Sequence, residues 1–305
     1  MNVNLLGLSV LIHGKQAINQ ANASDLFVEI SAEARSALQQ TLLDMYDDIR
    51  RICDRNHLTV FLAGGSALGA VRHQGFIPWD DDLDLAMTRR DFRKFQRIFE
   101  KELGEKYFLL APNGDLPAKS RFPKIVKKDT LFREITDASE EQFCGVFLDI
   151  FILDHIPENR LLQKWKEFRC NLLEFIAGQV LVYEVNTPEI RELYSRVGRW
   201  NYYLRRGLGF LFSFRRTETW YDCIDRAVQY QGKTSLCGLP TGSKHYLGEV
   251  FQKSDIFPVR YLPFEGRKAA VFFKVEKYLE NLYGDYMTIP DEADRARHYV
   301  KEMRL

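Results

Sequence analysis

Hydrophobic and polar residues alternate along the chain with two periods, one helical and one extended. Between Ser31 and Asn56 apolar side chains recur at alternating steps of four and three residues, at Leu38, Leu42, Met45, Ile49 and Ile52. This spacing places them on one face of an amphipathic α-helix that ends near Asn56. Residues 1–30 carry no such pattern and are predicted to be a weakly structured lead-in.

After this helix the pattern becomes that of an α/β core. A strand over Leu58–Ala63 is predicted to lead into a glycine turn, and a short helix follows through Val71. Thr88-Arg-Arg-Asp91 has the form of a capping box, which predicts a helix that ends near Leu103. Further strands are predicted over residues 107–111, 122–127, 130–135 and 147–153.

Beyond Leu161 the apolar spacing lengthens and becomes helical. One such stripe consists of Trp165, Phe168, Leu172 and Phe175. The last clear helix is predicted over Val275–Tyr283. We therefore expect an α/β (α+β) fold, with a catalytic core at residues 31–156. A mostly helical portion at residues 157–305 would pack on this core and bind substrate or acceptor.

Four aspartates lie within five residues of the segment WDDDLDL. In an extended strand successive side chains point to opposite faces, so Asp80, Asp82 and Asp84 would share one face. Leu83 and Leu85 would then lie on the other face, in the core. Carboxylates this close repel one another unless a cation neutralises them, and hard oxygen ligands suit Mg²⁺. The pattern therefore favours a metal site, with Mn²⁺ as the alternative ion, over a solvated acidic turn.

Two further features would complete this site. The Gly64-Gly65-Ser66 turn precedes the aspartates, and backbone amides at a glycine-rich turn and helix start bind anions. The apolar run Phe143–Leu153 contains a single charged residue, Asp149, which needs a partner if the strand is buried. We therefore expect the third carboxylate at Asp149. The alternative is that it accepts hydrogen bonds from a turn or pairs with an arginine.

The segment GGSALGAVRHQGFIPWDDDLDLAM resembles the opening motif of the LicD family, phosphocholine transferases related to the fukutins. A second block resembles the family at Asp149-Ile150-Phe151, Leu153-Asp154 and Pro157. A closing block does so at Phe257-Pro258, Pro263-Phe264, Tyr283–Met287 and Pro290. The likeness spans about residues 48–291. It departs from the family at Phe272-Phe273-Lys274, where a proline is expected before the final helix.

The resemblance implies a nucleotidyltransferase-like mixed sheet with flanking helices. In that fold a Gly-Ser turn carries phosphate and an Asp-x-Asp strand carries the metal. Transferred to this sequence, it implies phosphate or nucleotide binding at Gly64, Gly65 and Ser66. Metal ligation and catalysis would fall to Asp82, Asp84 and Asp149, with Asp80 as a further metal ligand.

The reaction implied by the resemblance uses CDP-choline, or a related CDP-alcohol, as donor. A hydroxyl of a cell-surface glycan precursor, such as one of lipopolysaccharide or teichoic acid, would attack the phosphorus that bears choline. CMP would leave, and Asp149 is the candidate base. Three alternatives stay open: transfer of NMP from an NTP, CDP-ribitol as the donor, and a non-catalytic nucleotide- or glycan-binding protein. Retention of Asp82, Asp84 and Asp149 disfavours the last of these.

Basic residues offer further phosphate contacts. The segment Lys119–Lys128 contains five cationic residues and no acidic residue. Within it, Lys124 matches the position of the LicD family best. The alternative is a solvated strand edge, which lysines protect from aggregation. Arg72 lies between the glycine turn and the aspartates, where it fits either a phosphate clamp or an ion pair with Asp81. His73 is expected to be structural.

The segment Arg199–Arg216 contains five arginines, six aromatic residues and no acid. This composition is typical of a helix that lies on an anionic membrane surface, where it would meet a lipid-linked acceptor. The sequence alone favours the alternative, a core helix with arginines at its rim.

Composition limits the remaining possibilities. The chain has 305 residues, of which 46% are hydrophobic and 28% charged, and its formal net charge of +1 argues against bulk nucleic-acid binding. Five cysteines without CxxC spacing predict neither zinc nor disulfides. No apolar run reaches the ~20 residues of a membrane span, and LLGLSVLI lacks the basic residue that precedes a signal sequence. We expect a cytoplasmic enzyme, with contact at the inner face of the membrane as the alternative that residues 199–216 leave open.

Overall fold

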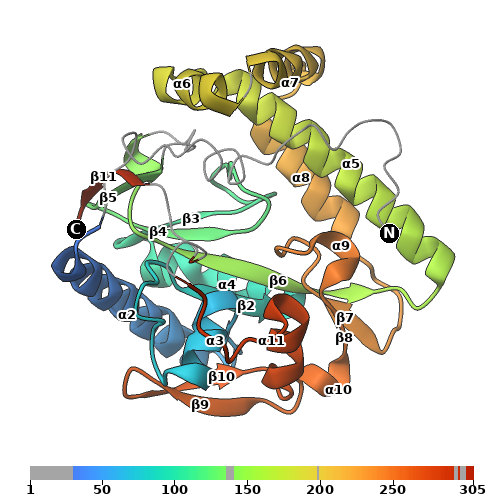
Figure 1. The fold of residues 1–305 in the computed structure, drawn as a ribbon. Coiled ribbons are helices and arrows are strands. Elements are labelled where there is room, and N and C mark those ends of the chain that lie inside the picture. The colour runs from blue at the N-terminus through green and yellow to red at the C-terminus, as the bar shows by residue number, and fades with distance from the viewer. Residues whose placement is uncertain (1–29, 135–140, 198, 292–294, 296–299) are drawn as a thin grey trace.

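The computed structural model describes residues 30–134, 141–197, 199–291, 295 and 300–305. Its central sheet has the strand order β1-β2-β6-β4-β3, and β7 and β8 extend it from β6 (Figure 1). The strands span Phe61–Leu62 (β1), Asp84–Thr88 (β2), Tyr107–Leu110 (β3), Lys124–Lys127 (β4), Phe147–Ile156 (β6), Leu236–Gly238 (β7) and Val250–Gln252 (β8). Only β2 and β6 pair in parallel among these described neighbours. The predicted mixed α/β architecture is confirmed.

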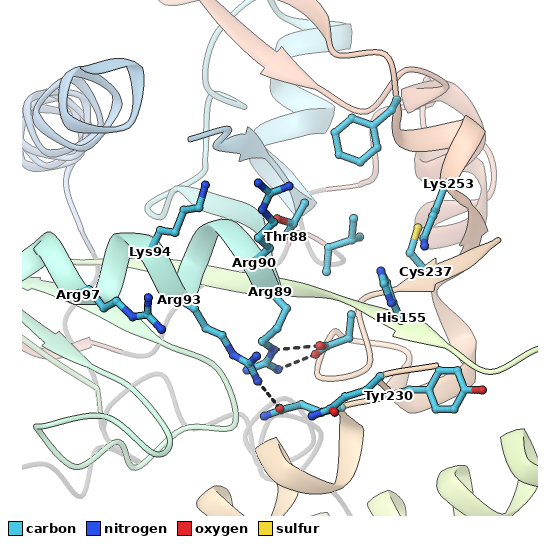
Figure 2. Close-up of a pocket in the computed structure, with 15 residues that line it drawn as sticks. Thr88, Arg89, Arg90, Arg93, Lys94, Arg97, His155, Tyr230, Cys237 and Lys253 are labelled. Atoms are coloured by element: carbon cyan, nitrogen blue, oxygen red, sulfur yellow. Dashed lines mark hydrogen bonds and ion pairs between the residues drawn. The ribbon is translucent and has the colours of Figure 1, made fainter. Parts of the chain in front are cut away.

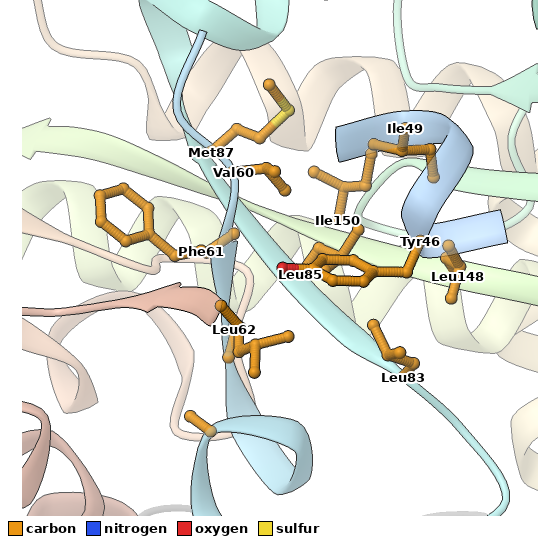
Figure 3. Packing of buried hydrophobic residues seen from close by; sticks show 14 of the residues in the cluster. Tyr46, Ile49, Val60, Phe61, Leu62, Leu83, Leu85, Met87, Leu148 and Ile150 are labelled. Carbon is orange, nitrogen blue, oxygen red and sulfur yellow. The ribbon is translucent and has the colours of Figure 1, made fainter. Parts of the chain in front are cut away.

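Two helices pack against the strands that carry the acidic residues, namely α2 (Ala32–Arg55) and α4 (Arg89–Leu103). Both follow the predicted spacing, and Thr88 caps α4 because its Oγ1 accepts the Asp91 amide proton at 3.1 Å. Figure 3 shows side chains of α2 packed against the sheet, with fully buried Tyr46, Ile49, Leu85, Leu148 and Ile150 among them. Burial of each such side chain stabilises the fold by about 1.5–3 kcal/mol.

A hairpin and a helix from the end of the chain complete the main core. The hairpin strands β9 (Arg260–Phe264) and β10 (Arg267–Val271) contact α3 (Gly64–Arg72) and β1, respectively. The helix α11 (Val275–Tyr283) contacts α3 and has the predicted bounds. The main cluster of buried apolar residues therefore combines residues 30–153 with residues 237–300. The division of the chain at 156/157 stays a prediction.

A helical layer covers one side of this core. It contains α5 (Arg160–Glu184), α6 (Pro188–Val197), α7 (Arg199–Phe212), α8 (Thr217–Val228) and α9 (His245–Gly248). A second apolar cluster joins α5 and α8 to β6 through Ile156, which is fully buried. The predicted apolar stripe of α5 is only partly buried in the protein. Trp165, Phe168 and Leu172 are exposed, whereas Phe175 packs against the second cluster.

Several strand predictions need correction. The first strand has two residues rather than six, because only Phe61 and Leu62 pair with β2. The predicted strand at 130–135 forms β5 (Leu131–Glu134), which pairs with β11 (Val300–Arg304) outside the central sheet. Strands β7 to β11, missed by the sequence analysis, interrupt the second half in its described part; each has three to five residues, too few for a clear period. The predicted lead-in falls on residues 1–29, outside the described residues.

The cysteines all lie in described ranges and are free thiols, as predicted. Within those same ranges, no helix combines the length and apolar character needed to cross a membrane.

A buried ion-pair network joins the sheet to the helical layer. Arg89, the first residue of α4, donates two hydrogen bonds to Asp154 of β6, at 2.9 and 2.6 Å. A third bond of 2.6 Å reaches Asp225 of α8. Burial raises the pKa of Asp154 although Arg89 opposes that shift. Arg89 thus neutralises carboxylates that would otherwise be buried without a cation.

We expect Arg89→Met to lower the free energy of unfolding by about 3–5 kcal/mol, because it leaves Asp154 buried without its cation. The matched control is Arg55→Met, which breaks the solvent-exposed pair with Glu102 and should cost less than about 1 kcal/mol. Urea unfolding monitored by circular dichroism measures both. Equal losses in the two variants would contradict the role of the network.

Candidate active site

Three strands place charged residues in one row across the sheet. Asp84, the first residue of β2, is the direct partner of Asp149 in β6, and Asp149 is the partner of Lys124 in β4. Partners in a row project from the same face of a sheet, and neighbouring strands are about 4.8 Å apart. Lys124 Nζ lies 3.2 Å from Asp149 Oδ1. The fold therefore brings together two predicted carboxylates and the predicted lysine, which are 25 to 65 residues apart in the sequence.

The glycine turn packs directly against the carboxylates. A Cβ atom on Gly64 would lie 2.2 Å from Asp84 Oδ2, and one on Gly65 would lie 2.9 Å from Asp80 Oδ2. Gly64 also has a φ of +48°, which disfavours other residues. Helix α3 begins at this turn, so its first backbone amides have no acceptor within the helix and its positive dipole end faces negative charge. The turn thus supplies amide donors beside the carboxylates.

Ser66 has a positional role in this arrangement. Its hydroxyl oxygen accepts a hydrogen bond of 2.9 Å from the backbone amide of Asp84, and the residue is buried. Ala63 donates a second bond of 2.9 Å to the Asp84 carbonyl. Together these contacts fix the start of β2 against the start of α3.

The consecutive aspartates form a separate cluster of possible metal ligands. In the described residues Asp80, Asp81 and Asp82 each offer one carboxylate oxygen, and these atoms lie within 4.8 Å of one another. This corrects the strand argument, because β2 begins only at Asp84 and Asp81 joins the group from the face assigned to the core. Burial alternates as predicted over residues 82–85, since Leu83 and Leu85 are fully buried whereas Asp82 and Asp84 are not. All-oxygen donors in such a group fit Mg²⁺ or Mn²⁺.

The comparison with known proteins agrees with this geometry. Residues 57–169 match the family model of the LicD/FKTN/FKRP nucleotidyltransferase domain. This segment is a LicD-family domain. It contains the glycine turn, the aspartate cluster, Lys124 and Asp149.

Similarity to one relative extends beyond the domain. Over 269 residues the chain is 28% identical to the lipopolysaccharide cholinephosphotransferase LicD of Haemophilus influenzae, which covers 87% of this chain and 95% of that protein. An uncharacterised protein of Rickettsia typhi is 33% identical over 161 residues, 52% of this chain and 48% of that protein. An uncharacterised protein of Rickettsia prowazekii is 27% identical over 150 residues, 49% of this chain and 51% of that protein.

Two tyrosines outside the LicD-family domain, which the sequence analysis did not assign to the site, complete its wall. The hydroxyl of Tyr278 in α11 accepts the Gly64 amide proton at 2.9 Å. Burial, followed by the charge of Glu249, raises its pKa well above the usual value. The pKa of Tyr283 is also raised, by partial desolvation and then by Asp84. The resemblance of the closing block around Tyr283 was the one available signal, since nothing local in the sequence links α11 to the glycine turn.

Arg72 holds the closing block in place. Its Nη1 donates to the carbonyls of Tyr286 and Thr288 at 2.7 and 3.3 Å. Burial lowers its pKa, opposed by the charges of Tyr283 and Asp80. The alternative ion pair of Arg72 with Asp81 stays a prediction, as these carbonyl contacts do not test it. The phosphate-clamp role stays a prediction, and these two carbonyl bonds would have to coexist with it.

The other predicted residues near the site have aromatic partners. Lys124 Nζ lies 3.5 Å from the centre of the Phe147 ring while it pairs with Asp149. His73 lies edge-on to Trp79, with ring centres 6.5 Å apart. Burial, followed by the charge of Arg72, lowers the pKa of His73, so the imidazole is neutral near pH 7. These contacts orient Lys124 and His73 from the sides of the site.

We expect Gly64→Ala to destabilise the protein more than Gly266→Ala. Both glycines have positive φ, which costs alanine about 1–2 kcal/mol, but only the Gly64 methyl group collides with Asp84. Gly266 has open space around it and is the matched control. Urea titration measures both losses. A Gly64→Ala variant that loses no more stability than the control would show that the turn tolerates a side chain beside Asp84.

Proposed function

We propose that the chain transfers phosphocholine from CDP-choline to a hydroxyl of a glycan precursor of the cell surface. The observation that carries this proposal is the row of Asp84, Asp149 and Lys124 beside the glycine turn, within a LicD-family domain. The relative from Haemophilus influenzae, named as a lipopolysaccharide cholinephosphotransferase, supports this reaction type. The proposal also specifies choline as the transferred alcohol and a glycan hydroxyl as the acceptor.

The amides of Gly65 and Ser66 at the start of α3 would bind the diphosphate of the donor, because they lie beside the carboxylates and the first turn of a helix offers them no acceptor. Asp80, Asp81 and Asp82 would hold Mg²⁺ or Mn²⁺, with Asp84 next to them; such an ion, when bound, offsets charge on phosphate oxygens. Tyr278 keeps the turn in position by accepting the Gly64 amide proton.

Asp149 would accept the proton of the attacking hydroxyl. The acceptor oxygen forms a bond to the phosphorus that bears choline, and the bond from that phosphorus to the CMP oxygen breaks. CMP leaves with the electron pair. Lys124 holds the Asp149 carboxylate at 3.2 Å and lies within the same row as the reacting groups, where it offsets negative charge.

Acceptor-dependent release of CMP from CDP-choline tests this function. We expect Asp82→Asn and Asp84→Asn to lower kcat on the order of 10²–10³-fold, because each weakens the binding of the cation that would offset negative charge on the phosphate oxygens in the transition state. Asp115→Asn, at an acidic residue of the 111–117 loop, is the matched control and should retain activity. Full activity in both folded site variants would refute the proposed site.

The same assay separates the alternatives. Release of pyrophosphate from CTP, without CMP release from any CDP-alcohol, would indicate nucleotidyl transfer through the same carboxylates. CMP release from CDP-ribitol or CDP-glycerol, but not from CDP-choline, would retain the reaction and change the head group. Failure of every donor with every acceptor would favour a binding protein of the same fold.

We further propose that helix α7 and the residues after it, up to Arg216, bring the enzyme to an anionic membrane surface. Large apolar side chains of this segment are strongly exposed: Trp200 by 89%, Tyr203 by 63%, Leu204 by 54%, Phe210 by 67%, Leu211 by 64% and Phe214 by 71%. Trp200 is three and four residues before Tyr203 and Leu204, which are each seven residues before Phe210 and Leu211, so the five side chains within α7 share one helix face. We call this set the α7 aromatic face.

The opposite side of α7 packs on the protein. Tyr202 and Arg205 are buried, and Gly209 approaches the backbone of Gln179 in α5. Figure 1 shows α7 on the far side of α5 from the central sheet. The expectation of a core helix is therefore wrong. An exposed aromatic face with Arg215 and Arg216 at its end and no acid in Arg199–Arg216 suits anionic lipid.

Vesicle flotation tests this surface. Wild type should bind vesicles that contain phosphatidylglycerol more strongly than phosphatidylcholine vesicles. The double variant Phe210→Ser, Leu211→Ser should bind at least about tenfold more weakly, since each apolar side chain contributes about 1.5–3 kcal/mol when buried. Tyr261→Ser, Phe273→Ser changes exposed aromatic residues elsewhere and should bind as the wild type. Equal flotation of all three proteins would exclude the α7 aromatic face as the contact.

A further inference from the structure

A cavity lies at the opposite end of the strands that carry the carboxylates. It has a volume of about 460 Å³ and is bounded by the start of α4, the end of β6, the segment after α8, β7 and the start of α10 (Lys253–Ile256). The strand β2 runs from Asp84 at the candidate active site to Thr88 at the cavity. Four residues of strand span about 13 Å. The cavity is therefore a separate site.

The cavity is strongly basic. Among the described residues that line it, the cations are Arg89, Arg90, Arg93, Lys94, Arg97 and Lys253, and the carboxylate is Asp154. Both oxygens of that carboxylate already accept hydrogen bonds from Arg89. Burial, followed by the charge of Lys253, lowers the pKa of His155, so this side chain adds no further positive charge near pH 7. This concentration of cations contrasts with the net charge of +1 for the whole chain.

The cations converge on the cavity from two sides. Arg90, Lys94 and Arg97 follow one another at steps of four and three, which places them on one face of α4. Figure 2 shows the α4 cations on one side of the space, with Lys253 and His155 across from them. If the α4 cations were only a solvent-exposed helix face, there would be no reason for Lys253 of α10 to line the same cavity. A concave surface lined by one sign of charge focuses the field and attracts counter-ions.

Some of the cations that line the cavity are held in place by hydrogen bonds to the protein. Arg93 donates to the Gln229 side chain at 2.7 Å, and Lys253 donates to the Thr234 carbonyl at 2.8 Å. For Arg90, Lys94 and Arg97 the described part of the chain provides no hydrogen bond or ion pair. Like charges on one helix face repel one another, and an anion bound among them would relieve that repulsion.

We propose that this cavity binds an anion that carries two or more closely spaced phosphate or carboxylate groups. Guanidinium groups bind such oxygens through two parallel hydrogen bonds, and lysines add point charges. One group of the anion would meet Arg90, Lys94 and Arg97, and the next would meet Lys253 across the cavity. The chemistry fits either an anionic part of a glycan acceptor or a free phosphorylated metabolite.

Titration calorimetry with inorganic pyrophosphate at low salt tests the site directly. The buffer contains EDTA, so that the aspartate cluster carries no metal and repels the probe. Wild type should bind in a saturable manner. The double variant Lys94→Gln, Arg97→Gln should have an affinity for pyrophosphate at least about tenfold lower, because it lacks two charged donors. The matched control Lys101→Gln, Lys268→Gln removes the same charge from exposed positions outside the cavity.

Binding by the cavity variant as tight as by the wild type, or no saturable binding by the wild type, would overturn the proposal. Equal weakening in the variant and in the control would also overturn it, since the effect would then follow net charge alone. These outcomes do not depend on transferase activity, so the proposed function and this site can fail independently.

A second experiment distinguishes the two sources of the anion. If the anion belongs to the acceptor, Lys94→Gln, Arg97→Gln raises KM for a phosphorylated acceptor, and leaves kcat and the KM of an unphosphorylated acceptor unchanged. If it is a free metabolite, pyrophosphate changes turnover of the wild type and the control but not of the cavity variant. Either result supports the cavity as an anion site and identifies its occupant class.

Discussion

The parallel pairing of β2 with β6 is the constraint on which the candidate active site depends. It aligns Asp84 with Asp149, two carboxylates that would repel one another in an apolar sheet without compensation. Lys124 of the next strand supplies one cation, and the start of α3 presents its positive end. A one-residue change of register would turn Asp149 to the opposite face and place an apolar side chain beside Asp84. The buried leucines of both strands keep the register fixed.

Residues remote in the sequence close this site. Tyr278 reaches the glycine turn from α11, and Arg72 binds carbonyls of the closing block that follows that helix. The end of the chain therefore belongs to the same structural unit as the LicD-family domain, although the family model covers only residues 57–169. This organisation explains physically why similarity to the Haemophilus influenzae protein extends over 87% of the chain.

The two ends of the parallel strands carry opposite charge. Carboxylates gather where β2 and β6 begin, and cations gather where they end, with the buried Arg89 network beneath the basic cavity. Arg89 serves the fold there, because its bonds to Asp154 and Asp225 join α4, β6 and α8. For Arg90, Lys94 and Arg97 of the same helix, the described part of the chain provides no hydrogen bond or ion pair. This separation keeps the cations of the cavity away from the carboxylates of the candidate active site.

The sequence by itself determined the local features: the helices α2, α4 and α11, the cap at Thr88, the buried Leu83 and Leu85, and the glycine turn with its acidic segment. Each follows from short-range periodicity or from backbone conformation, which neighbouring residues control. Only the tertiary structure decided which distant residues meet. Strand order places Lys124 beside Asp149, and packing of α11 brings Tyr278 to Gly64. The exposed side chains of α7 show that it is not the core helix that the sequence favoured. Such contacts depend on how whole elements pack, and no local pattern encodes them.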